Sequence, residues 1–197
     1  MSYFPGATTV GLVCSDGVVL ASEKRVTYGN VVLSKAAKKV FKITDRIGAA
    51  CAGLISDMQV LTRQITAQAN LYRFDVGRPI RVRSAAKALA NMLFGSRFLP
   101  YITQTIVGGI DEEPKIYVLD PVGSLIEDKY AAIGSGAEIA IGILESEYKP
   151  NITVEEGEKL AIRTVKSAIS RDVFSGNGID VLIIKESGIE EKVLELE

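Results

Sequence analysis

The order of predicted strands and helices constrains the fold of this chain more than any other feature. Short runs rich in β-branched residues and segments with helical spacing follow one another as strands, two helices, strands, two helices, strands. The predicted strands cover residues 8–14, 18–22, 39–43, 47–52, 102–107, 115–119, 124–126, 179–184 and 192–196. The predicted helices cover residues 56–76, 82–94, 137–148 and 154–170.

This order differs from the strict β-α alternation of a doubly wound sheet. Strands that cluster in hairpins form antiparallel sheets with one buried face, and paired helices can cover the outer faces. We therefore predict an α+β fold, a four-layer αββα sandwich of two antiparallel sheets flanked by helix pairs. With 197 residues and neither a repeat nor a linker, the chain suits a single domain.

Local signals mark the ends of several helices. Ser56 with Gln59, and Thr153 with Glu156, match the capping-box pattern and predict two helix N-termini. Gly77-Arg78-Pro79 predicts the end of the first helix.

The hairpins predict which strand ends lie together. Folding about Asp16 places Glu23 roughly opposite Thr9, on the strand that follows Ala7. Folding about Asp45 brings Lys39 beside the next strand. An acid and a lysine are thus expected at neighbouring strand ends.

Composition excludes several classes of site and partner. The chain has no histidine, which excludes a Ser-His-Asp or Cys-His site within one chain and every zinc motif that needs histidine. A net charge of −1 gives no general case for nucleic acid or an anionic membrane as partner, and no apolar run is long enough to span a bilayer. Cys14 and Cys51 lie in apolar runs, which is typical of buried thiols in a reducing compartment. We expect a cytoplasmic protein with no metal or other cofactor.

Seven short motifs carry the functional signal through their order. Each is weak alone; Gly134-Ser135-Gly136 before a helix, for instance, is either an anion site or a tight turn. The ordered set is Gly6-Ala7-Thr8-Thr9-Val10-Gly11, Ala21-Ser22-Glu23-Lys24-Arg25, Ser34-Lys35 through Lys39, Ala52-Gly53, Gly108-Gly109, Gly134-Ser135-Gly136, and Arg171-Asp172 through Ser175-Gly176. In this order, and at these intervals, the chain from Gly6 onward closely resembles the archaeal proteasome β subunits.

The resemblance implies an architecture and an assembly. It implies the four-layer sandwich of the N-terminal-nucleophile hydrolases, with a short leader at residues 1–6 and a single β-type domain at 7–197. It also implies seven-membered β rings that stack with α rings into a 20S core particle. That particle is a threonine-type endopeptidase for unfolded proteins and peptides, served indirectly by an ATPase regulator.

The family chemistry implies roles for particular residues. A mature N-terminal threonine supplies the nucleophilic hydroxyl, and its free α-amine, with an ordinary pKa of about 7.7–8.0, acts as the base. By resemblance, Lys39 is the cation near the hydroxyl, Glu23 orients Lys39, and the Gly53 amide stabilises the oxyanion. Three residues are expected to hydrogen-bond around the amine: Ser135, Asp172 and Ser175. Five positions match the specificity pocket, whose mostly apolar side chains favour large apolar substrate residues: Val26, Thr27, Ala37, Cys51 and Ile55.

One position departs from the family pattern. The family has threonine directly after the processing glycine, whereas here Gly6 is followed by Ala7, which has no hydroxyl. Thr8 is the alternative nucleophile, but its intervals to Glu23 and Lys39 are each one residue short. A slip of one residue along a strand turns a side chain to the opposite face, so Thr8 would need a bulge or strand slippage.

Two functions therefore remain open. Either the chain is itself an active threonine endopeptidase subunit, or it is a non-catalytic structural or assembly subunit that supports a second, active β subunit. In the second case the alanine is either natural or an engineered replacement of threonine. The short leader and the segment 123–128 look like a natural subgroup with a degenerate nucleophile position.

Overall fold

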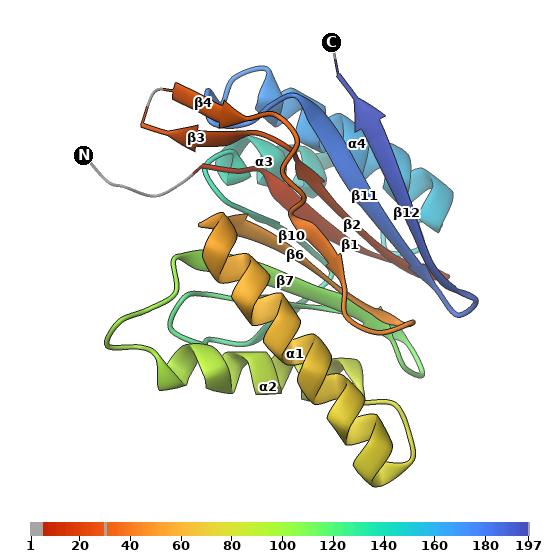
Figure 1. Ribbon diagram of the computed structural model, residues 1–197. Helices are drawn as coiled ribbons and strands as arrows, with labels where there is room; N and C mark the ends of the chain where they lie inside the picture. The colour runs from red at the N-terminus through yellow and green to blue at the C-terminus, as the bar shows by residue number, and fades with distance from the viewer. Residues whose placement is uncertain (1–5, 30, 197) are drawn as a thin grey trace.

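Two five-stranded antiparallel sheets form the centre of the computed structural model, which describes residues 6–29 and 31–196 (Figure 1). The first sheet has the order β10-β1-β2-β11-β12 and the second the order β5-β6-β7-β8-β9. The strands of the first sheet are β1 (Thr9–Cys14), β2 (Gly17–Glu23), β10 (Tyr130–Ile133), β11 (Gly178–Lys185) and β12 (Gly188–Glu195). Those of the second are β5 (Val40–Lys42), β6 (Ile47–Gly53), β7 (Thr103–Ile110), β8 (Pro114–Leu119) and β9 (Ile126–Asp128).

Two helix pairs cover the outer faces of these sheets (Figure 1). They are α1 (Ile55–Val76) with α2 (Val82–Gly95), and α3 (Ala137–Glu147) with α4 (Val154–Ile169). Three apolar clusters fill the spaces between the four layers. One joins α1 and α2 to the second sheet, one joins α3 and α4 to the first sheet, and one lies between the sheets. The predicted αββα sandwich is confirmed.

Glycines let the two sheets approach closely. A Cβ built at Gly48 in β6 would lie 2.3 Å from a Leu182 methyl carbon, and one at Gly108 in β7 would lie 2.7 Å from a Val18 methyl carbon. Larger residues at these positions would force the layers apart. The sheet-to-sheet packing therefore depends on small residues in the second sheet.

Two predicted helix ends are confirmed. Gly77 follows α1 in the left-handed conformation, with φ of 72°, and donates its N–H to the Arg73 carbonyl. Thr153 and Glu156 form a capping box at the start of α4, in which each side chain accepts a backbone N–H of the other residue.

The predicted start of α1 at Ser56 is wrong. The helix begins at Ile55 after Leu54, and no side chain caps it. The carboxylate of Asp57 instead accepts the N–H of Ile102, at 2.7 Å, and so ties the first turn to the chain that enters β7. The first turn of α1 therefore has a tertiary contact but no side-chain cap.

Some strand assignments also need correction. The first hairpin has a two-residue turn, so Thr9 pairs with Ser22, and Glu23 lies one residue further along, with its N–H bonded to the Thr8 carbonyl. The short hairpin of β3 (Val26–Tyr28) and β4 (Val31–Ser34) was not predicted, because it is largely exposed and lacks a buried face. Residues 124–126 were predicted as a strand, but β9 starts only at Ile126, and β10 was missed.

The predicted leader falls almost entirely outside the described residues, since only Gly6 of positions 1–6 is described. Gly6 is buried, and a Cβ there would overlap the Phe174 side chain. Among the described helices, none is both long and apolar enough to cross a membrane.

Candidate functional site

Ala7 lies at the edge of the first sheet, against the turn that leads into α3. Its N–H donates to the Ser135 hydroxyl at 3.1 Å, and its carbonyl accepts the Gly136 N–H at 3.2 Å. Gly134 has φ of +91°, and a Cβ there would lie 2.2 Å from the Ala7 carbonyl oxygen. The Gly134-Ser135-Gly136 motif is therefore a tight turn that packs against the backbone of Ala7.

Asp172 organises the hydroxyl groups around this point. Its Oδ2 accepts hydrogen bonds from Ser135 and Ser175, both at 2.6 Å. Each serine has one proton, and these short bonds use it. Ser135 is therefore an acceptor toward the nitrogen of Ala7, and Ser175 is an acceptor toward the Thr8 hydroxyl, 2.7 Å away.

The Thr8 side chain points to the opposite face of the strand from Ala7. Ala7 belongs to the cluster between the sheets, whereas the Thr8 hydroxyl lies beside Gly136 and Ala168, on the side of α3 and α4. Thr8 is fully buried and bonded to Ser175. This placement follows from the alternation of side chains along a strand, since the Thr8 carbonyl accepts the Glu23 N–H and so continues the register of β1 and β2.

Glu23 and Lys39 form a buried ion pair at the end of β2. Their side chains are 0% and 1% exposed, and the Lys39 ammonium contacts Glu23 Oε1 and donates to the Arg25 carbonyl at 2.6 Å. Glu23 Oε2 accepts the N–H groups of Arg25, at 2.6 Å, and Gly176, at 3.0 Å. The pair thus joins β2, the chain before β5 and the loop after α4.

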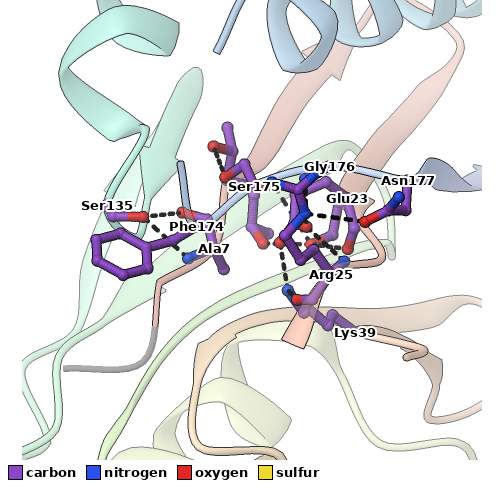
Figure 2. A network of polar contacts seen from close by, with 12 residues as sticks. Ala7, Glu23, Arg25, Lys39, Ser135, Phe174, Ser175, Gly176 and Asn177 are labelled. Atoms are coloured by element: carbon purple, nitrogen blue, oxygen red, sulfur yellow. Dashed lines mark hydrogen bonds and ion pairs between the residues drawn. The ribbon is translucent and has the colours of Figure 1, made fainter. Parts of the chain in front are cut away.

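The two polar groups form one continuous network. Ser175 belongs to the group around Asp172, and the next residue, Gly176, donates to Glu23. Figure 2 shows Ser175 and Gly176 between Ala7 with Ser135 on one side and Glu23 on the other. All five residues that the sequence assigned to the polar part of the site are therefore in one network: Glu23, Lys39, Ser135, Asp172 and Ser175.

Burial shifts both partners of the ion pair toward their neutral forms. Desolvation raises the pKa of Glu23, although Lys39 and two backbone N–H groups partly oppose this. Desolvation lowers the pKa of Lys39, although the attraction of Glu23, Asp172 and Asp180 partly opposes it. A lysine with a lowered pKa can stabilise a neighbouring anion or exchange a proton more readily than an exposed one.

Gly53 ends β6 beside a small cavity of about 230 Å³. Its φ is +137°, and a Cβ would lie 2.2 Å from the Ile102 carbonyl oxygen, so only glycine fits. Gly134 also lines this cavity, and Gly134 contacts the Ala7 carbonyl, so the cavity adjoins the polar network. The cavity is lined by Ala52, Gly53, Ile102, Thr103, Gln104, Pro121 and Gly134.

The five predicted pocket residues do not share one environment. Val26 and Thr27 are half-buried in β3, and Ala37 is half-buried with its N–H bonded to the Lys24 carbonyl. Ile55 is half-buried at the first turn of α1. Cys51 is fully buried, with its sulfur 3.7 Å from the Thr105 hydroxyl, and burial raises the pKa of the thiol to about 12. Cys51 is therefore an unreactive neutral thiol.

A larger cavity, of about 750 Å³, lies at the opposite end of β6. It is formed by the β5–β6 turn, the end of α1, the chain before α2 and the β7–β8 turn. Its charged residues lie at the rim of a surface hollow and show no buried polar network like the one at Ala7. We therefore place the functional site at the polar network. No cluster of three or more His, Cys, Asp or Glu side chains that could hold a metal ion occurs among the described residues.

The sequence interpretation missed several members of the network. Arg25 belongs to the motif at residues 21–25, which by itself could be a solvated strand end. Its guanidinium group nevertheless donates hydrogen bonds to Val173 and Asn177. Lys24 forms a second, mostly buried ion pair with Asp180, at 2.9 Å. Their partners lie about 150 residues away in the chain, and no local pattern signals these contacts.

Comparison with known proteins gives one consistent result. A family model described as "Proteasome subunit" matches residues 3–184. The chain is 48% identical to proteasome subunit beta 1 of Nitrosopumilus maritimus over 189 residues, 96% of each chain. It is 50% identical to proteasome subunit beta 1 of Ignicoccus hospitalis, over 93% of each chain. It is 51% identical to proteasome subunit beta 2 of Caldivirga maquilingensis, over 96% of this chain and 95% of the other.

Proposed function

Because the chain belongs to the proteasome subunit family and is a β-type subunit of the 20S core particle, we propose that it is a non-catalytic ring member whose site lacks only the nucleophilic hydroxyl. One observation carries this proposal. The Ala7 backbone is bonded to the group around Asp172, which is joined through the backbone of Ser175 and Gly176 to the Glu23–Lys39 pair, but position 7 offers a methyl group. The neighbouring hydroxyl, on Thr8, is on the other face of the strand and is bonded to Ser175.

The proposed chemistry of the complete site explains why these groups occur together. With threonine at position 7, the hydroxyl oxygen would attack the carbonyl carbon of a peptide, and its proton would pass to the α-amine. Because Asp172 fixes Ser135 as an acceptor, Ser135 would take one amine N–H and leave the amine lone pair available. The amine would then return the proton to the leaving nitrogen.

The remaining groups would stabilise charge during this reaction. Lys39, held by Glu23 and the Arg25 carbonyl, would favour the developing alkoxide. The Gly53 N–H, at the rim of the small cavity, would stabilise the oxyanion, a role worth roughly 3–4 kcal/mol elsewhere. Val26, Thr27, Ala37, Cys51 and Ile55 are proposed to lie around the substrate side chain.

The chain assembles with other proteasome subunits in the core particle. We place it in a seven-membered β ring between α rings, in the cytoplasm, where an ATPase regulator would deliver unfolded proteins. A second β subunit with threonine after the processing glycine would supply the activity. The occurrence of relatives numbered beta 1 and beta 2 supports such a mixed ring.

The alternative is that this chain is itself active through Thr8. It would require the strand to shift by one residue. Such a shift would break the Thr8–Ser175 bond and push the Thr8 side chain away from Gly136. The observed register therefore favours the non-catalytic role.

Co-expression distinguishes the two functions. The chain is produced with an α subunit alone, and separately with the α subunit and a β subunit that has Gly-Thr at the processing site. We expect particles of several hundred kilodaltons that hydrolyse peptides only in the second case, and intact-mass analysis should find residues 1–6 retained in the first. Cleavage before Thr8, or hydrolysis by the first particle, would overturn the proposal.

A further inference from the structure

We infer that Arg25 is a positioning residue that locks the loop of residues 172–177 onto the Glu23–Lys39 pair. This inference rests on the proposed function of the same site. It concerns the guanidinium group of Arg25, which lies on the side of the network away from Ala7 (Figure 2).

The guanidinium group holds the loop at two points. Its Nε donates to the Asn177 side-chain oxygen at 2.9 Å, and one terminal nitrogen donates to the Val173 carbonyl at 2.9 Å. Between these points, the group lies directly against Gly176, because a Cβ built there would come within 2.2–2.6 Å of three guanidinium atoms. The planar fork of an arginine can bridge two such acceptors, whereas the single ammonium of a lysine cannot reproduce the geometry.

The backbone of Arg25 contacts the ion pair itself. Its N–H donates to Glu23 at 2.6 Å, and its carbonyl accepts from the Lys39 ammonium at 2.6 Å. One residue therefore contacts the acid, the lysine and the loop that carries Ser175. The Gly176 N–H donates to Glu23 at 3.0 Å, so displacement of the loop would weaken this hydrogen bond to Glu23.

The loop that Arg25 contacts has no helix or strand of its own. Residues 172–177 lie between α4 and β11, outside any helix or strand. Asn177 has φ of 69°, in the left-handed region, which asparagine adopts more readily than most other non-glycine residues. Because the Asn177 side chain accepts the Arg25 Nε–H, the guanidinium holds this conformation at the residue where the loop enters β11.

The test uses the protein with a restored nucleophile, Ala7→Thr, in the assembled particle. Into it we introduce Arg25→Ala, Arg25→Lys or, as a control, Arg63→Ala, which removes an exposed arginine from α1. We expect Arg25→Ala to lower kcat by about 10- to 100-fold, the cost of misplacing reacting groups by about 1 Å, with KM changed less than about twofold. Guanidinium ion, added far below denaturing concentrations, should restore part of the lost kcat of the Arg25→Ala variant. The Arg25→Lys variant should keep a low kcat. Unchanged kcat, or a loss confined to KM, would overturn the inference.

A second measurement separates this inference from the proposed function. If Ala7→Thr itself does not hydrolyse peptides, the proposed site fails, and Arg25 is then judged by hydrogen exchange in the chain with Ala7. We expect faster exchange of the Ser175 and Gly176 N–H groups in Arg25→Ala, reversed by guanidinium ion and absent in Arg63→Ala. Equal exchange in all variants would show that Arg25 does not hold the loop.

Discussion

At the scale of single residues, the site combines an alanine at position 7, where the resemblance implies threonine, with a buried ion pair. Ala7 offers no hydroxyl, and its backbone bonds to Ser135 and Gly136. Glu23 and Lys39 stay paired although burying two charges is costly. The pH dependence of stability measures how far this desolvation cost exceeds the attraction between the two charges.

The pair should contribute least to stability when both partners are charged. Glu23 has a raised pKa in the folded chain, so its contribution is present below the unfolded value of about 4.3 and is lost as pH rises through the folded value. Lys39 has a lowered pKa, so its contribution is present above about 10.4 and is lost as pH falls through the folded value. We therefore expect the unfolding free energy, relative to the double variant Glu23→Gln with Lys39→Met, to pass through a minimum between these limits.

Urea unfolding of both proteins at a series of pH values checks this prediction. The double variant keeps side chains of similar size and removes both charges, so titrating groups that do not interact with the pair cancel in the difference. A maximum near neutral pH in the difference between the two unfolding free energies would contradict this prediction. The attraction between the charges would then outweigh the cost of their desolvation.

At the scale of elements, the capping box of α4 gives a local test of the fold. Thr153→Ala should lower the unfolding free energy by about 1 kcal/mol, since it leaves the Glu156 N–H without its side-chain acceptor. Ser167→Ala, on the exposed face of the same helix, removes a hydroxyl bonded only to a carbonyl of the preceding turn and should change stability by much less. Thermal unfolding measures both. Equal losses would mean that the box does not stabilise the start of α4.

The elements also show how far sequence reasoning reaches. Periodicity and turn signals predicted all four helices and the main hairpins, because these depend on residues close together in the chain. The register of the first hairpin was off by one residue, because the length of its turn is not fixed by Ser15 and Asp16 alone. The β3–β4 hairpin and β10 were missed because exposed or short strands show little hydrophobic pattern.

The residues of the candidate site were likewise only partly predictable from the sequence. Hairpin geometry placed Glu23 and Lys39 at neighbouring strand ends, and the structure brings them together. The resemblance supplied Ser135, Asp172 and Ser175, which local pattern alone could not connect to Ala7. Arg25, Asn177 and Asp180 were missed because their contacts depend on how the loop after α4 folds back onto β2.

At the scale of the whole molecule, the isolated chain leaves large apolar side chains in solvent. Phe98 and Leu99, in the chain between α2 and β7, are 89% and 87% exposed, and Phe74 on α1 is 84% exposed. Contiguous exposed apolar patches mark surfaces that partners cover, and Phe98 and Leu99 are adjacent in the chain. They fit a subunit that functions only within a particle.

Charges at this surface should therefore block assembly without unfolding the chain. We expect Phe98→Glu with Leu99→Glu to reduce entry into the core particle by at least about tenfold, the factor that corresponds to 1.4 kcal/mol of lost binding. Size-exclusion chromatography after co-expression with the α subunit measures entry, and circular dichroism checks that the fold is retained. Normal incorporation of the double variant would show that these residues lie outside the subunit contacts.

The central claim is that the site lacks nothing but a hydroxyl at position 7, and Ala7→Thr tests it most directly. Loss of a covalent nucleophile costs on the order of 10⁶ in kcat in a serine protease, so its return to a complete site should give a large gain. In purified particles without any other active β subunit, we predict removal of residues 1–6 by intact mass and hydrolysis of peptides with apolar residues before the cut. Ala7→Thr with Lys39→Ala should assemble but remain inactive. An Ala7→Thr particle that assembles normally, yet neither loses residues 1–6 nor cleaves peptides, would contradict the account.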